Sequence, residues 1–452
     1  GMGINPAWLL TGEGSSSLTD VSDQTGKTAG RLLDLVQAMS AISKMKLGSL
    51  AGKQHAKTLR ELNDALDAYE RVRAELQKQT RPIYRELVDN LQAAMNAREY
   101  RRVPELKSAL EQVARLCPDE ELELIALHRL ASYEYWSLNF SRALEIQRDV
   151  FYRALRKGRR LDGYDLENAH NFSRYLKQSC YASEAIGICR AALALAAPKS
   201  RWSNGWKEVM VALGWFEAEA GELSRGLARM QKVFPALSRE AQNMFYGVLL
   251  RPQMFAGVVD VQTLLGTPRK ITNAAIPTCW TFAACEEDIA ALRRLLAIYP
   301  NKDMERQRRM PYFMAGTAIL KAADHSRSLD VAAFGEELVA ESTRSGIPES
   351  AAKAMALIVM AQIARVSGNA ESGRKLTHQA DAALNSLPDD VTLPLLAQAK
   401  HHRNVLDCYD SNSHKAGVQA MRRRSERFFR RHIKRGYGFF RKLYPLTPSN
   451  AE

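Results

Sequence analysis

The sequence lacks the features of several protein classes. No run of apolar residues approaches the roughly 18–20 that cross a bilayer, and the start has no basic region followed by an apolar stretch, as a secretory signal would. The six cysteines form no CxxC pair, so we expect a reducing compartment and no structural disulfides. These absences predict a cytoplasmic protein that does not bind membranes.

Signatures of catalysis and metal binding are also missing. No GxSxG occurs, the nine histidines show no metal-ligand spacing, and Gly266-Thr-Pro-Arg-Lys lacks the remaining residues of a phosphate loop. The acidic pair Glu286-Glu287 is typical of charges at the start of a helix. We therefore expect no enzyme activity, no catalytic residue, no metal site and no cofactor.

The positive charge is concentrated near the C-terminus. The 452 residues include 64 Lys and Arg against 50 Asp and Glu, a net charge of +14. The segment 415–442 contains eleven of the basic residues and one acidic residue, Glu426, so it carries +10 and the remaining chain +4. An acidic partner, if there is one, is expected to meet this segment.

The basic segment has the pattern of an amphipathic helix. Six residues share one apolar face: Val418, Met421, Phe428, Phe429, His432 and Ile433. The pattern favours a helix that closes a helical array with this face. The alternative is that its basic face contacts a nucleic-acid backbone or an acidic protein. Contact with a membrane is the least favoured alternative. The candidate residues for such contact are Arg422, Arg423, Arg424, Arg427, Arg430, Arg431, Lys434 and Arg435.

Nearly the whole chain follows the helical period, which predicts an all-α fold. Residues 59–76 place Leu59, Leu62, Leu66, Tyr69, Val72 and Leu76 at spacings of three and four, which is typical of a coiled-coil-like seam. We expect this helix to end at Arg81-Pro82. Helix pairs then follow at 82–97/103–116, 119–137/140–156, 164–179/182–195, 203–220/223–237, 303–323/328–344, 348–366/370–386 and 391–409/414–435.

Small residues recur in these pairs. The second helices carry one at Ala143, Ala185, Gly226, Ala333 and Gly373, and twelve residues earlier lie Ala131, Ser173, Gly214, Lys321 and Ala361, small except for the lysine. Small residues let two helices approach closely, and stacked pairs bury the faces that one pair cannot. With Leu213-Gly214 and Gly221 as its best match, the pattern resembles the tetratricopeptide repeat, although the spacing of 40–42 exceeds the ~34 of that family. The resemblance implies an α-solenoid.

In the tetratricopeptide family the first helices of the pairs usually line the concave surface. Asparagine can hold an extended peptide through its backbone, and aromatic rings supply flat apolar walls. We therefore expect an effector or peptide groove, although each candidate residue also suits an ordinary core or surface. The candidates are Asn168, Asn171, Arg174, Tyr175, Trp206 and Met210.

Residues 3–14 read Gly-Ile-Asn-Pro-Ala-Trp-Leu-Leu-Thr-Gly-Glu-Gly, which suits a short helix with Asn5 as N-cap and Pro6 at its first position. The string resembles the end of the DNA-binding domain of XRE-family (phage-repressor-like helix-turn-helix) regulators. The resemblance implies that the helices that read DNA lie upstream of this chain. The alternative is an N-terminal capping helix.

Together these features predict the sensing and self-association region of a bacterial-type transcriptional regulator. A peptide or protein effector would bind the groove, and the long helix would form a homodimer. The alternative is an interaction scaffold without DNA function. The expected segments are a helix-turn-helix remnant (1–14), a linker (15–28), a long helix (29–81), repeats (82–250), an irregular helical connection (251–302), further repeats (303–412) and a basic capping helix (413–452).

Overall fold

The computed structural model describes residues 53–97, 99–267, 271–299, 307–325, 329–410 and 415–445. In these ranges the chain is helical and has no strand, apart from one isolated bridge between Leu161 and Ala196. The all-α prediction is confirmed. The expected helix-turn-helix remnant, the linker and the start of the long helix lie outside the described residues. The chain divides into two units, residues 1–129 and 130–452, each described here by itself.

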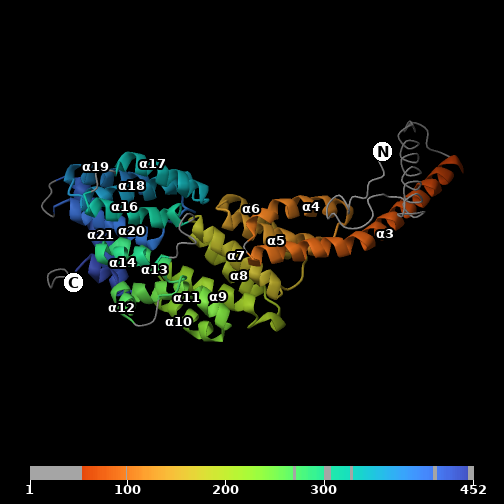
Figure 1. Ribbon diagram of the computed structural model, residues 1–452, viewed down its shortest axis with the longest axis horizontal. Helices are drawn as coiled ribbons and strands as arrows, with labels where there is room; N and C mark the ends of the chain where they lie inside the picture. Colours follow the sequence, from red (N-terminus) through yellow and green to blue (C-terminus); the bar gives the residue numbers. More distant parts are fainter. Residues whose placement is uncertain are drawn as a thin grey trace. The chain divides into compact units, whose positions relative to one another are not determined.

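The first unit is built on one long helix, α3 (Lys53–Ala97), which Figure 1 shows in orange. Its second half packs against α4 (Val103–Leu116) after the short η2 turn (Tyr100–Arg102). The buried residues of α3 follow the helical period at Tyr84, Val88, Leu91 and Ala94. Helix α5 (Glu120–Trp136) begins in this unit and continues into the next.

The expected break at Arg81-Pro82 is wrong, because α3 runs through Pro82. Pro82 is exposed, so water can satisfy the carbonyl group that loses its N–H partner. Apolar burial from Tyr84 onward favours the helical course on the C-terminal side. Arg81 also binds Asp119 at the start of α5, with Nε 2.6 Å from Oδ2.

The second unit consists of helices joined by short turns. Their bounds agree closely with most of the predicted pairs: α6 (Phe140–Arg156), α7 (Gly163–Gln178), α8 (Ala182–Leu195), α9 (Asn204–Glu219), α10 (Leu223–Val233), α11 (Arg239–Ala256), α12 (Val261–Gly266), α13 (Ile276–Glu286), α14 (Ile289–Ile298), α16 (Pro311–Ala323), α17 (Val331–Arg344), α18 (Glu349–Val366), α19 (Ala370–Asn385), α20 (Leu395–Cys408), α21 (Ala416–Lys434) and α22 (Phe440–Leu443).

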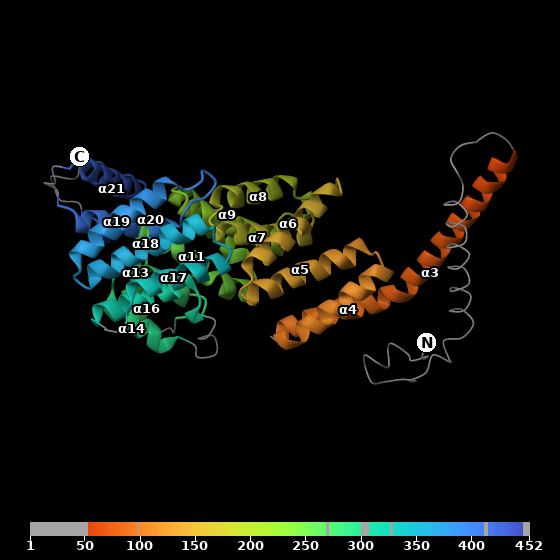
Figure 2. The same ribbon diagram turned by 90° about the horizontal axis from the view of Figure 1, so that it is seen from above.

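Alternate helices of this unit stack on one another. Contacts run from α7 to α9, α11, α13, α16, α18 and α20 in succession. The intervening helices α8, α10, α17 and α19 each contact the next member of that series. Figure 2 shows α7, α9, α11, α13, α18 and α20 along this unit. We call the series α7, α9, α11, α13, α16, α18 and α20 the inner helices.

The irregular connection expected at 251–302 is wrong. Residues 251–256 complete α11, and α13 and α14 pair with each other. Trp280, Phe282 and Cys285 of α13 are fully buried, so this segment forms part of a hydrophobic core cluster. Pro277 lies in the first turn of α13 and Gly257 caps α11 with φ of +73°, so both mark helix ends, whereas Pro252 lies within α11.

The last helices close the second unit. The predicted apolar face of the basic helix is confirmed, because all six of its residues are buried in α21. Beyond α21 the chain turns back onto α9, α11 and α13: the Tyr437 hydroxyl donates to the Ala218 carbonyl, the Phe439 N–H donates to the Phe255 carbonyl at 3.1 Å, and the Phe439 ring packs on Phe282. On another side, the Thr392 N–H donates to the Cys180 carbonyl at 2.8 Å and joins the turn after α7 to the segment before α20.

Candidate functional site

The inner helices surround a cavity of about 480 Å³, which we call the central cavity. Every inner helix contributes to its wall, together with the end of α5 and the turn between α17 and α18. Most of the wall is apolar. Its polar and aromatic residues are Tyr135, Arg174, Lys177, Gln178, Trp215, Glu219, Arg251, Thr281, Gln307, Tyr312, Ser345 and Lys400.

A buried ion cluster occupies one part of the wall. The Glu219 carboxylate lies 2.9 Å from Lys177 Nζ and 2.9 Å from Arg251 Nε, and it accepts a 2.8 Å hydrogen bond from Trp215 Nε1. Burial alone would raise the pKa of Glu219, but the two cations and these hydrogen bonds lower it to about 2. Glu219 is therefore ionised at neutral pH, and the cluster of two cations and one carboxylate keeps a net positive charge.

Two more cations line the central cavity. Arg174 of α7 lies over the Tyr135 and Tyr175 rings, with Cζ 4.7 and 5.3 Å from the ring centroids. Lys400 of α20 is buried, with 8% of its surface exposed, and burial lowers the pKa of its ammonium. The lining residues that the structure describes thus comprise four cations and a single carboxylate.

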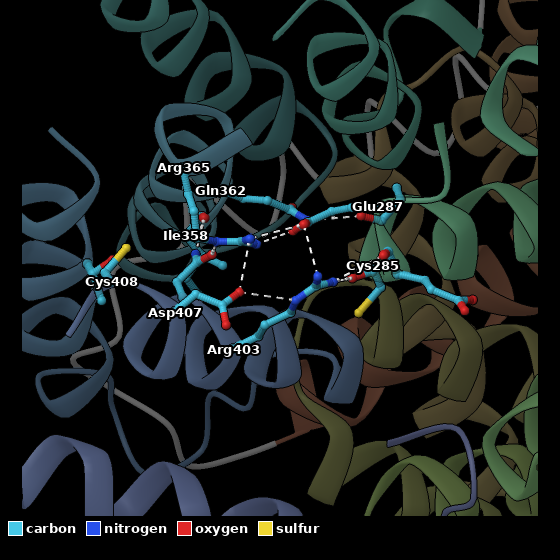
Figure 3. Close-up of polar contacts among 12 residues, drawn as sticks. Cys285, Glu287, Ile358, Gln362, Arg365, Arg403, Asp407 and Cys408 are labelled. Atoms are coloured by element: carbon cyan, nitrogen blue, oxygen red, sulfur yellow. Dashed lines mark hydrogen bonds and ion pairs between the residues drawn. The ribbon is translucent and has the colours of Figure 1, made fainter. Parts of the chain in front are cut away.

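Behind the wall lies a polar network centred on Glu287, which follows the last residue of α13 (Figure 3). The Glu287 carboxylate accepts hydrogen bonds from Arg365 and from Gln362 Nε2, the latter at 2.9 Å, and lies 3.1 Å from Arg403 Nη2. Asp407 bridges the two arginines, 3.0 Å from Arg365 Nη1 and 3.3 Å from Arg403 Nε. The network joins α13, α18 and α20.

This network also holds backbone groups of the wall. Gln362 donates to the Ala284 carbonyl at 2.9 Å, and Asn404 Nδ2 donates to the Ile358 carbonyl at 3.0 Å. Ala284 and Ile358 both line the central cavity, and Lys400 lies one turn before Asn404 on α20. Interlocked side chains of this kind give a pre-formed wall, as expected of a binding site.

Glu286 and Glu287 do not start a helix, and that interpretation is wrong. They lie at the C-terminal end of α13, where exposed carbonyl groups disfavour a negative charge. Arg403 offsets this, because Nη1 donates to the Cys285 and Glu286 carbonyls at 3.2 and 3.1 Å. The Glu287 side chain then pairs with the arginines of α18 and α20.

The structure brings one predicted effector residue, Arg174, to the wall, and Tyr175 lies behind it, stacked on the Tyr135 ring with centroids 4.9 Å apart. Asn171 accepts a hydrogen bond from Arg174 Nη2 at 3.4 Å. The other predicted effector residues line no part of this cavity. Asn168 accepts from Gln147 in the core between α6 and α7, Trp206 packs on Trp202, and Met210 Sδ contacts Arg229.

The predicted basic residues fall into two groups. Three bind other parts of the unit: Arg422 donates to the Leu406 carbonyl at 3.0 Å, Arg424 pairs with Asp381 at 2.6 Å, and Arg435 donates to the Gly221 carbonyl at 3.4 Å. Arg430 is partly buried. The exposed residues Arg423, Arg427, Arg431 and Lys434 are spaced four, four and three residues apart, so they form one stripe on α21.

Sequence reasoning missed Lys177, Glu219, Arg251 and Lys400, the charged residues of the central cavity. Lys177, Glu219 and Lys400 are charged residues that lie on buried helix faces. A charge on a face that is otherwise buried was the available signal, because such a charge needs a partner or a role.

Neither the protein-family models nor the curated proteins include a match to this sequence. In the part of the chain that the structure describes, no group of His, Cys, Asp and Glu side chains could hold a metal ion, and no helix is long and apolar enough to cross a membrane.

Proposed function

We propose that the chain is the sensing and self-association region of a bacterial-type transcriptional regulator, with a peptide or protein effector inserting a short segment into the central cavity. The observation that carries the sensing role is the cavity itself. Side chains from every inner helix converge on it, so a bound segment would contact the whole series of helices at once. A ligand that contacts many stacked elements can shift the equilibrium between their arrangements.

The volume and the chemistry of the cavity suit such a segment. A volume of about 480 Å³ lies within the ~300–1,000 Å³ of ligand pockets, and an apolar wall with a few convergent polar groups is typical of them. The Glu287 network fixes part of the wall in advance, which lowers the entropic cost of binding. The regulator part of the proposal rests on the resemblance of residues 3–14 to the end of an XRE-family domain.

The self-association part rests on the first half of α3. Its seam residues Leu66 and Tyr69 are 50% and 39% exposed, and Val72 and Leu76 are partly exposed on the same face. Apolar residues at spacings of three and four are the pattern by which two helices pair. A second copy of α3 would present the same seam, as a two-fold symmetric dimer requires.

The sensing role is tested by the binding of a pooled library of tetrapeptides, measured by native mass spectrometry on the full chain. The Ala397→Phe variant fills the cavity from α20, and Ala382→Phe places the same ring on the exposed side of α19 as a control. We expect a subset of peptides to bind the wild type and Ala382→Phe but not Ala397→Phe. Binding that survives Ala397→Phe, or no binding to the wild type, contradicts the sensing role.

The runner-up function is an interaction scaffold without a role at DNA. The observation that favours it is the stripe of exposed cations on α21, which an acidic protein could bind: Arg423, Arg427, Arg431 and Lys434. The opposite face of α21 is buried and holds the helix in place. A scaffold of this kind needs no occupant in the central cavity, so the same library experiment separates the two functions.

A further inference from the structure

The central cavity contains a buried ammonium group without a partner. Lys400 is 8% exposed, and no described residue forms a hydrogen bond or an ion pair with its Nζ. The carboxylate that influences it, Glu287, is already bound by Arg365 and Arg403. An unpaired buried charge is costly, so a residue of this kind calls for a counter-charge.

The wall of the cavity does not supply that counter-charge, because its charged residues leave an excess of positive charge. Glu219, the single carboxylate among the described lining residues, is engaged by both Lys177 and Arg251. With Lys400 and Arg174 added, the wall has four positive groups against one negative group, a net charge of +3.

Arg174 adds a second donor to the site. Its guanidinium group lies over two tyrosine rings, which hold its plane in place, and its buried Nε makes no hydrogen bond. A guanidinium group has five N–H donors in a fixed fork that matches a carboxylate. An anion in the cavity would therefore find a rigid donor on α7 and an ammonium on α20.

The remaining wall is apolar and defines the rest of the ligand. Val248, Leu338, Met355, Ile358, Val359 and Leu396 come from three inner helices, α11, α18 and α20, and from α17. We infer that the ligand of the central cavity is a carboxylate joined to an apolar body, with Lys400 as the main counter-charge and Arg174 as a second donor. The inference rests on the proposed function, because it names the chemistry of the segment that the sensing site would take.

Two sources can supply this chemistry: the C-terminal end of an apolar peptide and an aliphatic carboxylic acid. Three probes separate them, all tested on the full chain by native mass spectrometry. The first is the pooled tetrapeptide library with free C-terminal carboxylates, the second is the same library with C-terminal amides, and the third is decanoate beside the uncharged decanol.

We expect the wild type to bind peptides with a free carboxylate at least tenfold more strongly than their amides, or decanoate at least tenfold more strongly than decanol. Lys400→Met should reduce that ratio to nearly one, whereas Lys400→Arg should keep most of it. The unfolding temperature of each variant without ligand checks folding, and Lys400→Met should unfold at a temperature no lower than the wild type, because it removes an unpaired buried charge.

The outcomes separate this inference from the proposed function. If the wild type binds acids and amides equally and Ala397→Phe binds neither, the inference is overturned but the sensing site is still supported. Binding of decanoate alone supports the inference and overturns the peptide effector. No binding of any probe overturns both, and a Lys400→Met variant that keeps the tenfold preference for acids overturns the assigned role of Lys400.

Discussion

Gly226 of α10 lies so close to Gly214 of α9 that a Cβ atom at Gly226 would overlap the Gly214 carbonyl oxygen. The same Cβ would lie 2.8 Å from the Ala218 backbone nitrogen. Both contacts are to backbone, which cannot move aside without separating the two helices. The pair thus shows why small residues recur at these positions in the sequence.

Gly226→Ala should therefore destabilise the protein by about 2 kcal/mol or more, the cost of overpacking in a core. Urea unfolding followed by circular dichroism measures it. Gly187→Ala is the matched control, because a Cβ on that residue of α8 would meet nothing within 4 Å. There the change should stabilise the helix by about 0.5–1 kcal/mol. Equal effects of the two substitutions would contradict the close approach of α9 and α10.

Glu219→Gln should lower the free energy of unfolding by about 3 kcal/mol at neutral pH, because Lys177 and Arg251 would lose their shared carboxylate in a buried site. Glu336→Gln on α17, an exposed carboxylate, is the control and should change it by less than about 0.5 kcal/mol. Chemical denaturation of the three proteins gives the comparison. A Glu219→Gln variant as stable as the control would mean that the ion cluster contributes nothing.

The pKa of Glu208 predicts a dependence of stability on pH. Burial, and then the nearby Glu167, raise this pKa to about 7, against the opposing effect of Arg174. The folded protein therefore holds this proton more tightly than the unfolded chain, and its stability falls as the pH rises from about 4.5 through about 7. The full effect of the shift is about 3 kcal/mol.

Glu208→Gln should remove this part of the dependence and be more stable than the wild type at pH 8. The measurement is the unfolding free energy of both proteins at intervals between pH 5 and pH 8, in constant salt. Curves that run parallel over this range would show that Glu208 does not titrate there.

The exposed seam of α3 predicts a dimer, and negative charges introduced into this seam should dissociate it. The wild type should sediment as a dimer at micromolar concentration, and Leu66→Asp combined with Tyr69→Asp should give a monomer. Leu116→Asp is the control, because this leucine of α4 is 48% exposed and lies outside the seam. A monomeric wild type, or a dimer unaffected by the double substitution, would end the self-association proposal.

Helix bounds could be predicted best where the local sequence pattern agrees with the burial of the helix in the structure. Helix α6 has the predicted bounds, Phe140–Arg156, and α7 and α8 are matched to within a residue at each end. Errors arose at prolines. The sequence predicts that a helix ends at Pro82, but burial from Tyr84 onward maintains this helix; Pro252 and Pro277 lie in the segment predicted to be irregular, yet each belongs to a helix. Tertiary packing decides these cases, and the sequence around a proline does not report it.

The candidate site was harder to predict than the helices. Lys177, Glu219 and Lys400 are far apart in the sequence and line the same cavity only because α7, α9 and α20 all contribute to its wall. Of the predicted effector residues, Arg174 alone faces that cavity, because periodicity identifies a helix face but not which neighbour covers it. The Glu287 network depends in the same way on contacts across 75 residues or more.

The most direct test of the central claim is a crystal structure of the full chain with the library peptide that binds most strongly. The account predicts peptide density in the central cavity, with its carboxylate within 3.5 Å of Lys400 Nζ and its apolar side chains against α18 and α20. Peptide density on another surface, with the central cavity unchanged, would contradict it.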